Sequence, residues 1–348
     1  MRAVVFAGRN AVRVDDVPEP TIVEPTDAIV RATLCGICGT DLHLIAGDFP
    51  GMEPGMTLGH EIVGDVVEVG TAVRHVRPGD RVFASDFVAC GRCRWCDRGD
   101  HWECAERAFF GSGHTFGPFL AGAQAELVRV PFADGTLLAL PQGCSAEAAI
   151  LLADNLPTGW VAIERSALRP GEAVAVIGGG AIGQLVSLCA QAAGAGYVVV
   201  VEPNADRRAF AEAHGAFGAA PDEALELVRS LTNGDGADVV VEAVGRNATL
   251  GAALGLARKR GRVVSVGVHA TERWDFPLAA AFADELSVSF AIGDAIRTRR
   301  ALLSLLESGV LDPRDVVDAR VSFADAAAAY ADLAAQRALK VVIDPRLH

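Results

Sequence analysis

The hydrophobic residues of this chain follow two different patterns. From Met1 to about Ala153, short apolar runs alternate with glycine and proline, as in Glu61–Val69 (EIVGDVVEV) and Ala125–Val130 (AELVRV). Runs of this length between turn residues predict strands, here of a twisted and mainly antiparallel sheet.

From Glu172 to Ala291 the pattern instead predicts strands that alternate with helices. The helix after the fourth strand is expected to continue to about Lys259. Interleaved helices and strands are typical of a doubly wound parallel sheet in an α/β protein. The expected strands are Ala173–Gly178, Tyr197–Glu202, Phe217–Ala220, Ala237–Val244, Arg262–Gly267 and Leu286–Ala291.

The C-terminal segment contains more elements than the parallel sheet needs. It predicts helices at Arg299–Ser308 and Phe323–Leu333 and a strand at Leu339–Ile343. We therefore expect two domains, the first formed by 1–153 together with 292–348 and the second by 154–291.

Charge and targeting signals narrow the possible partners. The chain has 44 acidic and 31 basic residues and a formal net charge of −13, which disfavours nucleic acid and anionic membranes as partners. The uncharged run Ala173–Val201 is long enough to span a bilayer, but glycines interrupt it, and we interpret it as strand, turn, helix and strand. Because Met1–Asn10 lacks the long apolar stretch of a signal peptide, we expect a cytoplasmic protein.

Six of the eight cysteines lie between Cys35 and Cys104, which favours metal binding over disulfides. Four of them have the spacing C-x2-C-x2-C-x7-C, which suits one tetrahedral zinc ion without an open position, hence a structural site. An iron–sulfur cluster is the alternative, because its ligand spacings overlap with these. The four residues are Cys90, Cys93, Cys96 and Cys104.

A second constellation consists of Cys38 in CGICGTDLH and His60 in GHE. One cysteine, one histidine and one carboxylate can hold a catalytic zinc ion that keeps an open position. The spacing alone does not distinguish this site from a buried cysteine and a structural histidine.

The sequence Gly178–Gly183 (GGGAIG) satisfies the dinucleotide-binding pattern G-x-G-x-x-G between a strand and a helix. Gly178 would make the turn, Gly180 would let the backbone approach a pyrophosphate, and Gly183 would allow close helix packing, while Ala181 and Ile182 open the helix whose N–H groups face the anion. Glu202 ends the next strand, where a carboxylate accepts hydrogen bonds from ribose hydroxyls and favours NAD over NADP. Arg207 and Arg208 leave NADP open, because an arginine nearby could accommodate its phosphate.

These motifs, in this order and together with VSVG at Val264–Gly267, resemble the zinc-dependent medium-chain dehydrogenases over essentially the whole chain. The resemblance implies a GroES-like β-rich catalytic domain interrupted by a Rossmann domain. It also implies that Cys38, His60 and Asp154 bind the catalytic zinc. Many members have cysteine at the position of Asp154.

The resemblance assigns further roles by position. Thr40 and His43 would carry the substrate proton to solvent, and Glu61 would lie near the zinc. Lys340 matches a basic residue of the family that contacts the cofactor. Gly39 stands where some members have a second basic residue, which contacts the pyrophosphate. Thr158, Arg207 and Gly267 complete the expected cofactor contacts.

The implied protein is an enzyme with two zinc ions per chain and NAD, which interconverts an alcohol (primary, secondary or polyol) and its aldehyde or ketone. A homotetramer is expected, with a homodimer as the alternative. A formaldehyde- or polyol-type dehydrogenase is a narrower possibility. Cys38, His60 and the four-cysteine loop argue against a zinc-free enone or quinone reductase, and the second metal site argues against a non-enzymatic zinc-binding module.

Overall fold

The computed structural model describes residues 1–347 of the chain, which divides into two compact units. Unit 1 contains Met1–Asp154, Asp294–Glu307 and the C-terminal segment from Arg314. Unit 2 contains Asn155–Gly293 together with the short segment Ser308–Pro313. Most of the C-terminal segment therefore belongs with the N-terminal part of the chain.

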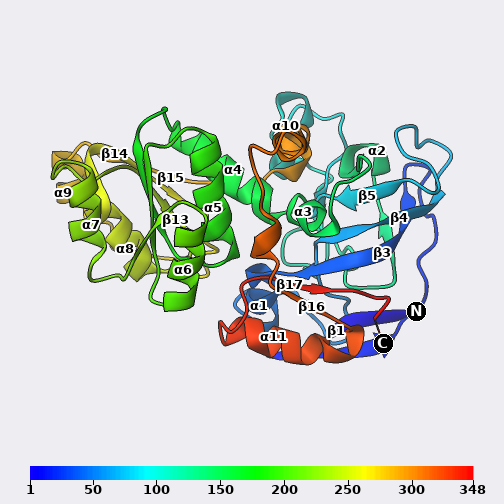
Figure 1. The fold of residues 1–348 in the computed structure, drawn as a ribbon. Helices are drawn as coiled ribbons and strands as arrows, with labels where there is room; N and C mark the ends of the chain where they lie inside the picture. Colours follow the sequence, from blue (N-terminus) through cyan, green and yellow to red (C-terminus); the bar gives the residue numbers. More distant parts are fainter. Residues whose placement is uncertain (348) are drawn as a thin grey trace. The chain divides into compact units, whose positions relative to one another are not determined.

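Unit 1 is built on a seven-stranded sheet, in which β16-β17-β3-β4-β5-β9 are neighbours and β8 pairs with β3 (Figure 1). All of its ladders are antiparallel except the one between β16 and β17, which confirms a mainly antiparallel sheet. The strands are β3 (Ala28–Ile37), β4 (Ile62–Val69), β5 (Arg81–Ala84), β8 (Leu127–Val130), β9 (Leu137–Ala139), β16 (Ala319–Val321) and β17 (Val341–Ile343).

Two smaller strand pairs and several helices complete unit 1. The hairpin of β1 (Arg2–Gly8) and β2 (Ala11–Asp16) joins the core through Val4 and Val5, and β6 (Phe87–Val88) pairs with β7 (Ala108–Phe109). The helices are α1 (Gly39–Ala46), α2 (Ala133–Thr136), α3 (Ala146–Leu151), α10 (Ala295–Glu307) and α11 (Ala326–Ala334). Helix α10 begins four residues before the expected Arg299, because Asp294 accepts a hydrogen bond from Arg297 N and caps it.

Unit 2 is a six-stranded parallel sheet in the order β12-β11-β10-β13-β14-β15, the doubly wound arrangement that the sequence predicts. Its central strands are valine-rich and buried on both faces, as parallel strands covered by helices must be. The strands are β10 (Ala173–Ile177), β11 (Tyr197–Val201), β12 (Phe217–Ala219), β13 (Ala237–Glu242), β14 (Ala257–Ser265) and β15 (Ser287–Phe290).

In Figure 1, α7 (Ala224–Leu231) and α8 (Asn247–Leu256) lie on one side of this sheet, and α4 (Asn155–Ser166) and α5 (Ala181–Ala192) on the other. Helices α6 (Ala205–Ala213) and α9 (Leu278–Ala283) complete the unit. The expectation that the helix after β13 continues to Lys259 was wrong. Ala257 is extended and pairs with Ala237, so β14 starts there. No helix in the described part of the chain is long and apolar enough to cross a membrane.

Candidate active site

Cys38, His60, Glu61 and Asp154 converge in unit 1, with one ligand atom from each lying within 4.8 Å of the others. Cys38 follows β3 and precedes α1, while His60 and Glu61 directly precede β4, the neighbour of β3 in the sheet. Asp154 comes from the segment after α3. Its Oδ2 lies 3.4 Å from Cys38 Sγ and 3.4 Å from His60 Nε2.

The donor set fits a zinc ion. Thiolate, imidazole and carboxylate are the side chains that zinc prefers. His60 Nε2 is buried and has no hydrogen-bond partner, an expensive state for a polar atom unless a cation binds it. Burial by itself would raise the pKa of Asp154, but its polar neighbours, His60 first among them, outweigh burial and lower the pKa to about 2. The cluster therefore contains a carboxylate ready to bind a cation.

Asp41, which the sequence analysis did not single out, holds the other side of His60. Its Oδ1 lies 3.1 Å from His60 Nδ1, and its Oδ2 accepts a hydrogen bond of 3.0 Å from Cys38 N. Both side chains are almost completely buried. A carboxylate at Nδ1 leaves Nε2 directed at the cluster, as in carboxylate–histidine–zinc arrangements. The position of Asp41 in the first turn of α1, after Cys38, was the available signal.

Glu61 and Lys340 form a buried ion pair beside the cluster. Lys340 Nζ donates to Glu61 Oε1 at 2.6 Å and to Ile37 O at 3.1 Å, and both charged side chains are at most 1% exposed. A Cβ at Gly36 would lie 1.7 Å from Glu61 Oε2, so glycine provides the space for this carboxylate. Burial opposes the charge of Lys340, but Glu61 outweighs it and raises the pKa of Lys340 above its ordinary value. In this structure the ammonium is thus engaged by Glu61; its expected contact with the cofactor stays a prediction.

The second metal-type cluster is the four-cysteine loop, whose sulfur atoms lie within 4.8 Å of one another. Backbone hydrogen bonding, chiefly from Cys96, lowers the pKa of Cys93 to about 6, which favours the thiolate. Phe87 and Phe109 pack against the loop. His101, which lies within this loop, is turned to another partner, since its Nδ1 is 3.0 Å from the carboxylate of Asp294.

The glycine loop follows β10 in unit 2. Gly178 has a φ of +97°, and a Cβ at Gly183 would lie 1.7 Å from Gly178 O, so both positions require glycine. Gly180 is the N-cap of α5, whose first N–H groups are thereby available to an anion. The buried Glu202 lies against the loop: its Oε2 accepts from Gly179 N at 2.7 Å.

The two arginines after Glu202 differ in their surroundings. Arg208 donates to the backbone oxygens of Glu202 and Pro203, both at 2.8 Å. Arg207 Nη1 lies near the loop, 3.9 Å from where a Cβ of Gly180 would be.

The remaining expected cofactor residues of unit 2 are Thr158 and Gly267. Thr158 lies on α4, and a Cβ at Gly293 would come within 2.3 Å of its hydroxyl oxygen. Gly267 follows β14, where a Cβ would lie 2.0 Å from Gly245 N.

Both units of this chain match known protein families. Residues 24–142 match the family model of the alcohol dehydrogenase GroES-like domain, and residues 181–308 match that of zinc-binding dehydrogenases. A probable zinc-binding alcohol dehydrogenase of Mycobacterium tuberculosis is 39% identical over 332 residues, covering 95% of this chain and 85% of that protein. The chain belongs to the zinc-dependent medium-chain alcohol dehydrogenases.

Solved structures agree with this membership. The alcohol dehydrogenase of Thermus sp. ATN1 superposes with a TM-score of 0.93 at 38% identity, over 99% of both chains. A candidate zinc-binding dehydrogenase of Sinorhizobium meliloti, solved with NADP bound, has a TM-score of 0.86 at 30% identity, again over 99% of both chains. The protein is thus a zinc-dependent alcohol oxidoreductase.

In this alcohol dehydrogenase, α1 contains Thr40 and His43, the two residues expected to relay the substrate proton. Thr40 and His43 are three residues apart, so they share one side of the helix. Asp48 was not anticipated: its Oδ2 lies 2.6 Å from His43 Nδ1 and orients the ring. Both His43 and Asp48 are about one third exposed, so the pair has access to solvent.

Another residue that the sequence analysis missed is Asp86, a buried carboxyl beside Asp154 and its cluster. Its backbone N–H donates to Ala153 O at 3.1 Å, next to Asp154, and Ser85 Oγ donates to its Oδ1 at 3.2 Å. Burial, reinforced by the charge of Asp154, raises the pKa of Asp86 well above its ordinary value. The sequence offered no signal, because an isolated aspartate in SDFVAC is not a motif.

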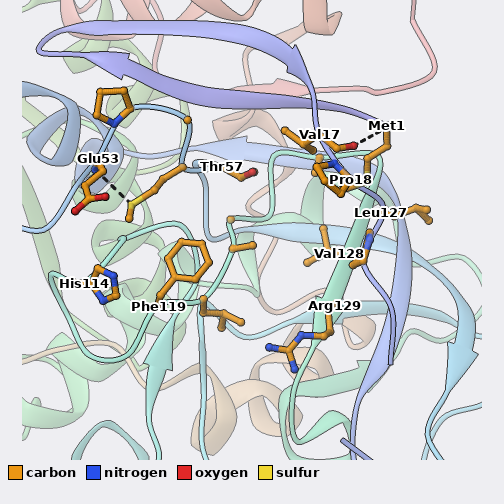
Figure 2. Close-up of a pocket in the computed structure, with 18 residues that line it drawn as sticks. Met1, Val17, Pro18, Glu53, Thr57, His114, Phe119, Leu127, Val128 and Arg129 are labelled. Atoms are coloured by element: carbon orange, nitrogen blue, oxygen red, sulfur yellow. Dashed lines mark hydrogen bonds between the residues drawn. The ribbon is translucent and has the colours of Figure 1, made fainter. Parts of the chain in front are cut away.

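A separate open groove of about 810 Å³ lies elsewhere in unit 1 of the dehydrogenase (Figure 2). Its lining includes Val17, Pro18, His114 and Phe119, and none of the cluster residues described above. We therefore do not include it in the active site.

Proposed function

We propose that this dehydrogenase oxidises an alcohol with NAD, and in reverse reduces the carbonyl, at a catalytic zinc held by Cys38, His60 and Asp154. The convergence of these side chains from distant parts of the chain, with His60 Nε2 buried and without a hydrogen bond, is the observation that carries the proposal. Bound there, zinc would act as a Lewis acid that lowers the pKa of the alcohol.

The chain's own residues would move the proton. Thr40 accepts it from the substrate hydroxyl and His43 passes it to solvent, a general-base relay. Asp48 supports this step, because a carboxylate at 2.6 Å from His43 Nδ1 holds the ring in one orientation. Asp41 keeps the His60 ring in place from the side opposite the metal.

Lys340 would control the charge next to the metal. An unpaired Glu61 would add a second carboxylate beside Asp154, and Lys340 neutralises it at 2.6 Å. With Cys38 and Asp154 as the anionic ligands, the zinc site would then be formally neutral before substrate binds.

For the nicotinamide cofactor we propose NAD rather than NADP. Glu202 supports this choice, because its buried carboxylate lies against the glycine loop, where the 2′-phosphate of NADP would meet a like charge. The cofactor would be held by the loop Gly178–Gly183, with Thr158, Arg207 and Gly267 as further contacts. We further propose that Cys90, Cys93, Cys96 and Cys104 bind a second, structural zinc. A cytoplasmic homotetramer stays the prediction made from the sequence.

The decisive test is metal content measured together with activity. The purified protein is expected to contain two zinc ions per chain. Cys38→Ser and His60→Ala should each lower this to about one and abolish turnover, because each removes one of three protein ligands. Cys144→Ser is the matched control, since Cys144 lies in neither cluster. Full metal content and activity in either ligand variant would refute the assignment, and a panel of primary, secondary and polyol substrates would define the alcohol.

A further inference from the structure

A fully buried carboxylate, Glu242, organises the end of β13 in unit 2. Its Oε1 accepts hydrogen bonds from Val244 N (2.9 Å), Gly245 N (2.7 Å) and Thr249 Oγ1 (2.8 Å). Its Oε2 accepts one of 2.6 Å from Ser265 Oγ, at the end of β14. Two backbone N–H groups and two hydroxyl groups thus surround the two carboxylate oxygens and hold the side chain in place.

This arrangement determines the tautomer of a neighbouring histidine. A serine hydroxyl has a single proton, and Ser265 gives it to Glu242. His269 Nε2 lies 2.8 Å from Ser265 Oγ, so Nε2 must donate the hydrogen bond that the hydroxyl oxygen accepts. The neutral ring therefore carries its proton on Nε2 and presents Nδ1 as an acceptor. Within residues 1–347, Nδ1 makes no hydrogen bond.

The ring is held from two further sides but not covered. Phe290 of β15 meets it edge to face, with ring centroids 5.8 Å apart. Glu242 Oε2 is 3.6 Å from Nε2, and the His269 side chain remains 21% exposed. An oriented acceptor at a partly open surface can reach a ligand.

The position of this group relative to the glycine loop suggests which ligand it would meet. Ile177, Glu242 and Ser265 are in register across β10, β13 and β14, and Ala243 N donates to Ile177 O at 2.9 Å. Glu202 lies at the same edge of the sheet but on the other side of β10, at the end of β11. In a doubly wound sheet a dinucleotide lies across the carboxyl ends, with one mononucleotide over each half. If Glu202 binds the adenosine ribose, His269 lies in the half that would receive nicotinamide mononucleotide.

We propose that His269 is a cofactor-binding residue, whose Nδ1 accepts a hydrogen bond from the nicotinamide half of NAD, either from a ribose hydroxyl or from the carboxamide N–H. Glu242 and Ser265 act as positioning residues that set the tautomer and the ring orientation. This inference rests on the proposed function in one respect, namely that the carboxyl edge of unit 2 binds NAD.

The test compares two ligands that share the adenosine half. NADH and ADP-ribose are titrated into the zinc-loaded enzyme and into His269→Phe, which keeps a ring of similar size but has no acceptor. In His269→Phe, the affinity for NADH is expected to fall about tenfold, which is the contribution of one hydrogen bond. If His269 contacts the carboxamide, the affinity for ADP-ribose should stay within about twofold of wild type. Because ADP-ribose keeps the second ribose, a contact to a ribose hydroxyl would weaken it too, and AMP then serves as the unaffected ligand.

Two further variants distinguish a direct contact between His269 and the cofactor from a purely structural role of this residue. His269→Asn keeps an acceptor close to the Nδ1 position and is expected to recover part of the NADH affinity. His214→Phe replaces a histidine at the C-terminal end of α6, stacked on Phe210, and should leave the binding of all ligands unaffected.

Unchanged NADH affinity in His269→Phe, or an equal loss for NADH and AMP, would overturn the role of His269. Wild-type protein that binds neither AMP nor NADH would instead overturn the proposed function, and this inference with it.

Discussion

Replacing Glu202 by glutamine should change the cofactor preference, because it removes the buried charge but keeps the shape of the side chain. Glu202 is only 4% exposed and accepts from Gly179 N at 2.7 Å and from Asn204 N at 3.0 Å. The two donors bind different oxygens, so glutamine keeps an acceptor for one of them, whereas alanine would leave both backbone N–H groups without a partner. Glu202→Gln therefore isolates the electrostatic contribution better than Glu202→Ala.

The expected size follows from Coulomb's law. Two unit charges about 4 Å apart repel by about 4 kcal/mol at an effective dielectric constant of about 20, and a phosphate carries nearly two charges. Solvent and the guanidinium of Arg207, close to Gly180, reduce this gross repulsion to about half or less. We expect NADP to gain about 2–3 kcal/mol and NAD to lose about 1 kcal/mol through a weaker ribose hydrogen bond. The ratio of the two kcat/KM values should then shift by two to three orders of magnitude.

The assay is kcat/KM for NAD and NADP with one alcohol at saturation, in wild type and Glu202→Gln. Arg207→Gln, alone and combined with Glu202→Gln, is the control for the positive partner. The double variant should lose part of the NADP gain. A wild-type enzyme that prefers NADP, or a ratio that moves less than threefold in Glu202→Gln, would refute the reasoning.

Three further predictions concern stability. Cys93→Ser should lower soluble yield and thermal stability while the remaining folded protein keeps its other zinc, because a closed metal site contributes folding energy; a stable variant that has lost only turnover would mean that the two metal sites are exchanged. Lys340→Met should destabilise by about 3–5 kcal/mol in urea unfolding, since it leaves the Glu61 charge buried and unpaired, and adding Glu61→Gln should restore most of the loss. Burial opposes the charge of Asp344, but Arg346 and Arg320 outweigh it and hold the pKa of Asp344 well below its usual range. The stabilisation from Asp344 is therefore complete above the unfolded pKa of about 4 and is lost as the pH falls through the native pKa. The free energy of unfolding of Asp344→Asn should thus be lower than that of wild type at pH 7 and differ less from it at pH 3. An equal difference at both pH values would mean that these ion pairs do not stabilise the fold.

The sequence by itself determined the features whose causes are local. Valine-rich runs between glycine turns specify β10, β11 and β13, because a strand buried on both faces needs apolar side chains at every position. The glycine loop is equally local, since Gly178 is required by its own φ of +97° and Gly183 by its contact with Gly178 O in the same loop. The four cysteines lie within one short loop, so their spacing was sufficient to predict a shared cluster.

Only the tertiary structure decided which distant side chains meet. Asp154 and Cys38 are 116 residues apart, and Lys340 and Glu61 are 279 apart. The second pair exists because β17 lies antiparallel to β3 with Val341 opposite Ile37, which places the residue before β17 beside the end of β3. Such a register depends on the packing of the whole sheet, and no local pattern around Lys340 contains it. For the same reason the resemblance assigned Lys340 only a contact with the cofactor, whereas in the folded chain it pairs with a buried glutamate that only the fold brings within 2.6 Å.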